Sequence, residues 1–265
     1  MLVNSVIIVL REVLEATLMI SVLLAVSRPL QLASRWLAAG LALGLVGAAA
    51  YGYFLGPVSN LFDGVGQELV NALLQFGTYA ALLLIVFLIA RQGSQPYRNS
   101  RVLPTAMSTA IALAAAREGS EILVFVTGFL HMDNFMPSVG LGSFAGAAIG
   151  CSIGVLFYYF LLAMPVRRTL RIALALLALA AAGMSAQATR LLIQADWISV
   201  AGPLWDSSGF IAEDSLPGQL LYALVGYEAT PSATEALVYT ASIALMALSI
   251  FLGFRAAGQV PTRVQ

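Results

Sequence analysis

The chain has 265 residues, of which 60% are hydrophobic and only 10% charged, and its mean hydropathy is +0.90. This composition lies far outside the range of soluble globular proteins. The net charge is zero, every basic residue is arginine and no basic run occurs, which excludes nucleic-acid binding. One cysteine and one histidine exclude disulfide frameworks, cysteine metal clusters and multi-histidine metal sites.

Apolar runs long enough to cross a membrane recur along the chain, and the alternating segments typical of membrane barrels are absent. We therefore predict an all-α, polytopic membrane helix bundle. A crossing helix needs about 20 residues. This rule predicts seven transmembrane helices, at 4–27, 33–55, 68–90, 104–131, 138–164, 170–195 and 231–254.

The distribution of arginine predicts the orientation of the chain. Ten of the thirteen basic residues lie in alternate connections or in the C-terminal tail, on one side of the predicted bundle, while the other connections hold acidic residues. The positive-inside rule therefore predicts an N-terminus outside and a C-terminus in the cytoplasm. The ten are Arg28, Arg35, Arg91, Arg98, Arg101, Arg167, Arg168, Arg171, Arg255 and Arg263.

Two copies of one charged motif lie inside apolar runs. They read Arg-Glu-Val-Leu-Glu at 11–15, in the first span, and Arg-Glu-Gly-Ser-Glu at 117–121, in the fourth. Because three spans separate them, the two helices cross the membrane in opposite directions. The pattern predicts inverted repeats over approximately 4–90 and 104–195, followed by an outer loop at 196–230 and a seventh helix at 231–254.

Each motif places two glutamates at i and i+3, on one helix face, with an arginine within reach of the second. Every charge at mid-membrane costs about 2.5–3.5 kcal/mol on the insertion scale, so such residues are functional by default. Oxygen ligands favour iron(III), manganese, magnesium or calcium over soft metals, and chemistry alone leaves that choice open. The predicted metal ligands are Glu12, Glu15, Glu118 and Glu121, with Arg11 and Arg117 as supporting charge partners.

Other polar residues have more than one interpretation. Glu68, Asn71 and Gln75 share one face of the third span, where they could line an ion pathway or form hydrogen bonds between helices. Arg190, near the outer end of the sixth span, is predicted to extend to the interface. Glu235 is predicted to form a capping box with a serine three residues earlier. His131 is left out of the site.

The two Arg-Glu-x-x-Glu motifs, in the first and fourth of seven spans with the N-terminus outside, resemble the high-affinity iron permease family of the oxidase-dependent iron transporter type. The likeness covers nearly the whole chain, including 203–208 and 213–216, which resemble the outer loop of bacterial members. It implies that the four motif glutamates bind iron during transport and that both motif arginines are required. Gly-Ser-Glu-Ile at 119–122 departs from the fungal pattern, which favours the bacterial inner-membrane branch.

These observations predict a single integral membrane permease domain, 1–265, in the bacterial cytoplasmic (inner) membrane. It would move iron into the cytoplasm by alternating access, without enzymatic activity and with no cofactor besides the transported iron. Expected partners are the iron ion, membrane lipid and periplasmic iron-delivery or iron-oxidising proteins. A permease for another divalent or heavy metal cation and an iron-binding membrane sensor are the alternatives.

Overall fold

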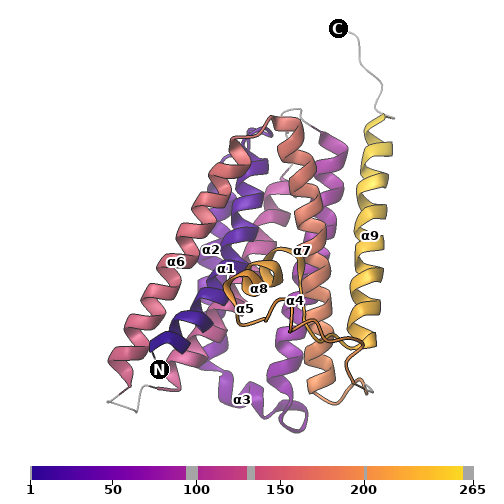
Figure 1. Ribbon diagram of the computed structural model, residues 1–265. Helices are drawn as coiled ribbons and strands as arrows, with labels where there is room; N and C mark the ends of the chain where they lie inside the picture. The colour runs from indigo at the N-terminus through magenta and orange to yellow at the C-terminus, as the bar shows by residue number, and fades with distance from the viewer. Residues whose placement is uncertain (1, 94–100, 130–134, 200–201, 259–265) are drawn as a thin grey trace.

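The computed structural model describes residues 2–93, 101–129, 135–199 and 202–258, and the long elements within them are all helices. These helices stand side by side as a bundle (Figure 1). Short elements connect two of them: α3, Leu55–Ser59, and η1, Leu61–Gly64, precede α4, while α8, Leu216–Val225, precedes α9. The long helices are α1, Leu2–Ser27; α2, Arg35–Tyr53; α4, Gly66–Gln92; α5, Val102–Thr127; α6, Met136–Leu162; α7, Val166–Gln194; and α9, Ala233–Gly258.

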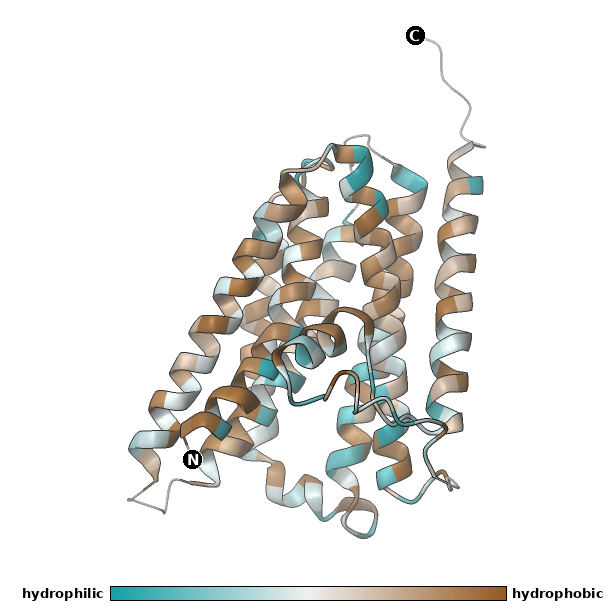
Figure 2. Cartoon of the chain, viewed as in Figure 1, coloured by the Kyte–Doolittle hydropathy of each residue, from teal (hydrophilic) through white to brown (hydrophobic). Residues whose placement is uncertain are grey.

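Each predicted span lies on one of these long helices, so the all-α prediction is confirmed. By length and composition, α2, α4, α6, α7 and α9 can cross a membrane. Helices α1 and α5 have 26 residues each, and each carries the three charged residues of one motif. Figure 2 shows apolar residues along most of the helical surface and hydrophilic ones gathered at helix ends and near α8. The protein is a polytopic membrane helix bundle; the count of seven spans stays a prediction.

The bundle is packed most extensively where α1 meets α6 and where α2 meets α5. Glycines lie at both contacts. A methyl group on Gly146 of α6 would lie 2.5 Å from the carbonyl oxygen of Val6, and one on Gly44 of α2 would lie 2.5 Å from the Ala115 side chain. Such small residues let helix backbones approach closely in lipid, where burial of apolar side chains gives no driving force.

An apolar core fills the end of the bundle that carries the arginine-rich connections. It joins the C-terminal halves of α1 and α4 to the N-terminal halves of α5 and α7. Its fully buried members include Leu23, Ile85, Leu103, Met107 and Leu177. Both charged motifs lie beyond this core, toward the opposite end of the bundle. The core therefore separates the motifs from the arginine-rich end.

The segment predicted as an outer loop, 196–230, contains a helix that the sequence did not predict. Helix α8 begins after Ser215, whose Oγ accepts a hydrogen bond from a backbone N–H three residues later, and ends at Gly226, with φ +68°. It lies across the middle of the bundle (Figure 1). Its apolar residues pack against Leu10, Leu14 and Leu18 of α1. Ten residues are too few to span a membrane, so the length rule overlooks this helix.

Candidate metal site

The two charged motifs meet at one place inside the bundle. Arg117 of α5 is buried, and its Nη1 lies 2.8 Å from Glu118 Oε1 and 3.2 Å from Glu15 Oε2 of α1. Its Nε lies 3.1 Å from Glu121 Oε1. One guanidinium therefore contacts three carboxylates from two helices that are far apart in the sequence.

Three carboxylates form a group that can hold a cation. One oxygen each from Glu12, Glu118 and Glu121 lies within 4.8 Å of the other two. Glu12 and Glu118 are buried, and each has an oxygen without a hydrogen-bond partner. Two ligands on opposite sides of an ion, each about 2.1 Å from it, are about 4.2 Å apart. Small side-chain movements would therefore bring all three oxygens onto one ion.

Glu15 has different surroundings from the other three motif glutamates. Its Oε2 contacts Arg117, and its Oε1 lies 3.7 Å from Nε of Arg11. The Arg11 guanidinium lies over the ring of Tyr222 of α8, 3.9 Å from the ring centroid. The two motifs are thus alike in sequence but not in geometry, because Arg117 points into the carboxylate group and Arg11 points to α8.

A cavity of about 340 Å³ reaches the site at Glu121. Glu68 and Asn71 of α4 also line it, and each has a buried side-chain oxygen without a hydrogen-bond partner. Gln75 donates from Nε2 to Oε1 of Gln187 at 2.8 Å, which links α4 to α7. The remaining lining residues are Gln67, Val124, Phe125, Leu191 and Gln194. Of the three residues on the polar face of α4, two line the cavity and one joins helices.

The prediction that Arg190 extends to the interface stays a prediction, and the structure adds its partners at the outer end of α7. Its guanidinium pairs with Glu228, and its Nε donates to Glu235 Oε1 at 3.1 Å. The predicted capping box is confirmed, since the Ser232 N–H donates to Glu235 Oε2 at 2.7 Å and the Glu235 N–H donates to Ser232 Oγ at 3.2 Å. The two acids pair with an arginine that is partly exposed. His131 lies outside the described residues.

The acidic residues of 196–230 also help to fold that segment. Glu213 Oε1 accepts a hydrogen bond from the Ala229 N–H at 2.6 Å. Asp206 is exposed, and the hydroxyl and N–H of Ser208 donate to its Oδ1 at 2.6 and 2.9 Å. These hydrogen bonds hold the pKa of the Asp206 carboxyl below its ordinary value, because they favour the charged form. Charge in this segment therefore shapes the chain around α8.

The helix bundle with charged residues in its apolar interior defines a polytopic integral membrane protein, and ionisable residues inside such proteins mark functional sites. Residues 2–261 match the Iron permease FTR1 family, and the chain belongs to that family. It is 25% identical over 251 residues to the ferrous iron permease EfeU of Yersinia pestis, covering 88% of this chain and 87% of that protein. It is 27% identical over 258 residues to the EfeU of Escherichia coli O6:K15:H31, covering 88% and 89%.

No solved structure matches the chain. The resemblance inferred from the two motifs is confirmed by the family match. The protein is therefore an iron transporter rather than an enzyme, and iron is its transported substrate.

Proposed function

We propose that this protein takes iron up into the bacterial cytoplasm through a site that Glu12, Glu118 and Glu121 form inside the membrane. Glu15 is the fourth carboxylate of the site and acts through its ion pairs with Arg11 and Arg117. The observation that carries the proposal is the convergence of three carboxylate oxygens, from two helices, within 4.8 Å. Carboxylates this close in a membrane interior repel one another unless a cation binds, an arginine pairs with them or one of them takes up a proton.

The charge of the site favours iron(II) as the transported form. With four ionised glutamates and two arginines, the two motifs carry a net charge of −2. A divalent ion brings this charge to zero, so the loaded site costs less free energy in the apolar interior than the empty site does. The relatives in Yersinia and Escherichia are described as ferrous iron permeases. Other divalent metals with oxygen ligands remain the alternative cargo.

Packing between the helices supports an inverted repeat made of α1, α2 and α4 and of α5, α6 and α7. Gly44 of α2 packs against the carbonyl oxygen of Ala112 in α5, and Gly146 of α6 packs against the carbonyl oxygen of Val6 in α1. The two glycines, at 44 and 146, are 102 positions apart, and the two carbonyl positions, 6 and 112, are 106 apart. The second contact is therefore the equivalent of the first, with the two halves exchanged. The offset of 106 also relates the two motifs.

At a second pair of equivalent contacts between the halves, the glycine lies on the motif helix in one contact and on the partner helix in the other. Gly119, in the second motif, faces Ala48 of α2, while its equivalent in the first motif, Val13, faces Gly150 of α6. At each contact a glycine makes room for the residue on the partner helix. The exchange keeps both contacts close, as expected when one packing arrangement occurs twice with different sequences.

The arrangement of cavity and core supports an outward-facing state. The positive-inside rule puts the arginine-rich end in the cytoplasm, and the apolar core lies between that end and the motifs. The cavity lined by Glu68 and Asn71 lies on the other side of Glu121. Iron would enter through this cavity, and transport would require the apolar core to open. Gln75 and Gln187 join one helix from each half, close to the cavity.

The remaining expectations fit this proposal. Seven spans, an N-terminus outside and a C-terminus in the cytoplasm would place the chain in the bacterial inner membrane as one permease domain. The cavity would then face the periplasm, where iron-delivery or iron-oxidising proteins could supply it, and the apolar helix surfaces would contact lipid. The iron is cargo and not a resident cofactor. A sensor would bind the ion without moving it.

Uptake of radioactive iron, supplied under reducing conditions to cells without other iron transport, tests the proposal. We expect Glu118→Gln to abolish uptake while the protein remains in the membrane, since Gln keeps the shape but removes a charged ligand. Asp214→Asn, an amide replacement at an exposed carboxylate outside the site, is the control and should retain uptake. Normal uptake by Glu118→Gln, after normalisation to membrane expression, would contradict the proposed site. Iron binding without uptake by the wild type would favour a sensor.

A further inference from the structure

The two motif arginines face different surroundings, and α8 makes the difference. Three carboxylates surround Arg117. Arg11 has one carboxylate nearby, Glu15 at 3.7 Å, and the face of the buried Tyr222 ring at 3.9 Å. A cation over an aromatic face is attracted by the ring quadrupole, most strongly where water is excluded. Tyr222 therefore holds the Arg11 guanidinium on the α8 side of α1.

We propose that Tyr222 is a positioning residue of the iron site, which holds Arg11 beside Glu15 so that Glu12 stays free to bind the ion. This inference rests on the proposed function. Arg11 is adjacent to Glu12 in the chain, and its long side chain can turn toward either glutamate. A guanidinium bound to Glu12 would bring a second positive charge, besides that of Arg117, into the carboxylate group and repel the entering cation. With Arg11 on Tyr222, Glu12 keeps an oxygen that has no hydrogen-bond partner.

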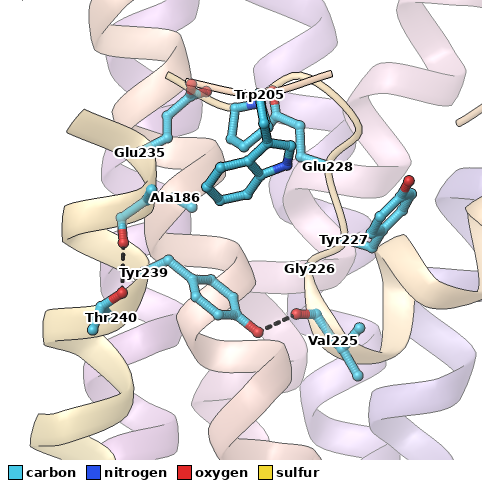
Figure 3. Close-up of a pocket in the computed structure, with 11 residues that line it drawn as sticks. Ala186, Trp205, Val225, Gly226, Tyr227, Glu228, Glu235, Tyr239 and Thr240 are labelled. Atoms are coloured by element: carbon cyan, nitrogen blue, oxygen red, sulfur yellow. Dashed lines mark hydrogen bonds between the residues drawn. The ribbon is translucent and has the colours of Figure 1, made fainter. Parts of the chain in front are cut away.

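Contacts with two other helices fix the end of α8 near Tyr222. The hydroxyl of Tyr239 in α9 donates to the carbonyl oxygen of Val225 at 2.6 Å (Figure 3). Gly226 packs on Gly183 of α7 so closely that a methyl group on Gly183 would lie 2.5 Å from the Gly226 Cα. Helices α7 and α9 thereby set the place of the tyrosine, and through it the place of Arg11.

Apolar packing alone would give Tyr222 a different role. Neighbouring α8 residues pack against leucines of α1, and a large apolar side chain at 222 could simply complete that contact. The two roles predict different effects of a Tyr222 substitution once Arg11 has also been replaced. A packing residue acts whatever stands at position 11, whereas a positioning residue acts only while an arginine is there. A double-mutant cycle separates the two.

The experiment measures Mn²⁺ binding to the purified full chain in lipid nanodiscs by calorimetry, with Mn²⁺ as a divalent ion that prefers oxygen ligands. We expect Tyr222→Leu to raise the Kd about tenfold, because the freed Arg11 competes for Glu12. Tyr222→Phe keeps the ring and should stay within about twofold of the wild type. Tyr53→Leu makes the same change at an exposed tyrosine and should leave the Kd unchanged.

The cycle is completed in an Arg11→Gln background, where Tyr222→Leu should cause no further rise in Kd. An equal rise in both backgrounds, or a rise in the Kd of Tyr222→Phe that persists in the Arg11→Gln background, would overturn the positioning role. The proposed function fails in another way: Mn²⁺ binding that survives Glu12→Gln combined with Glu118→Gln, or no binding by the wild type, would show that the carboxylates are not the site. An unchanged Kd in Tyr222→Leu overturns only the inference about Tyr222.

Discussion

Replacing Glu12 or Glu15 by glutamine makes the same chemical change at positions three residues apart, and the structure predicts different results. Glu12 belongs to the carboxylate group, whereas Glu15 lies outside it and contacts two arginines. Glu12→Gln should therefore weaken ion binding. Glu15→Gln should instead weaken the contact between α1 and α5.

The magnitudes depend on the contacts that are lost. An interaction with a charged group contributes about 1.5–3 kcal/mol, so loss of one ligand carboxylate should raise the KM for iron by up to about 100-fold. Glu12→Gln also relieves repulsion with Glu118 and Glu121, so thermal stability should stay equal or rise. In Glu15→Gln, Arg117 keeps two carboxylates, and a loss of about 2 kcal/mol should lower the Tm by about 4–8 °C.

The assay pairs iron uptake kinetics in cells with thermal unfolding of the purified protein in detergent. Asp214→Asn, at an exposed carboxylate, is the control for both measurements. The reasoning is refuted if Glu15→Gln raises KM as much as Glu12→Gln and leaves the Tm unchanged. Glu15 would then be a direct ligand, and the ion would be held by all four motif glutamates, as the symmetry of the sequence suggests.

Three further predictions concern topology, pathway and packing. A reporter fused after Arg255 should be cytoplasmic and a tag near Glu213 should be reachable from outside; a periplasmic reporter would contradict the orientation. A cysteine replacing Asn71, which lines the cavity, should react with a water-soluble thiol reagent and be protected by Mn²⁺. A cysteine replacing Gln75, a buried position outside the cavity lining, should react slowly. Equal reactivity at both positions would refute the pathway. Gly146→Val should lower the Tm by roughly 4 °C or more, because its side chain would meet the α1 backbone; an unchanged Tm would show that α1 and α6 can separate at little cost.

The sequence predicts the long helices well because the thickness of a membrane fixes their length. The predicted span at 4–27 corresponds to Leu2–Ser27, and that at 138–164 to Met136–Leu162. It also predicts that Arg117 reaches Glu121 in its own helix, since positions i and i+4 share a helix face. These features depend on local helix geometry and on the thickness of the lipid bilayer, so the amino-acid sequence is enough to predict them.

Features that depend on packing between segments far apart in the sequence are harder to predict from the sequence. Nothing within 11–15 indicates that Arg11 turns toward α8, because Tyr222 is more than two hundred residues away in the sequence. The start of α8 does carry a signal, since Ser215 is a good N-cap and a proline stands at 217. The partners of Arg190 are not predictable for a similar reason, because Glu228 and Glu235 come from a later part of the chain.

The crossed packing of the two halves has a consequence for biogenesis. Helix α1 enters the membrane with Arg11, Glu12 and Glu15, yet its main packing partner α6 and the cross-helix arginine are synthesised more than one hundred residues later. Until then its charges, at about 2.5–3.5 kcal/mol each, lack their final partners. We therefore expect the charged residues of α1 to stay in a polar environment, such as the insertion machinery, until α5 and α6 have been synthesised. The dependence is mutual, since α2 likewise finds its main packing partner in α5.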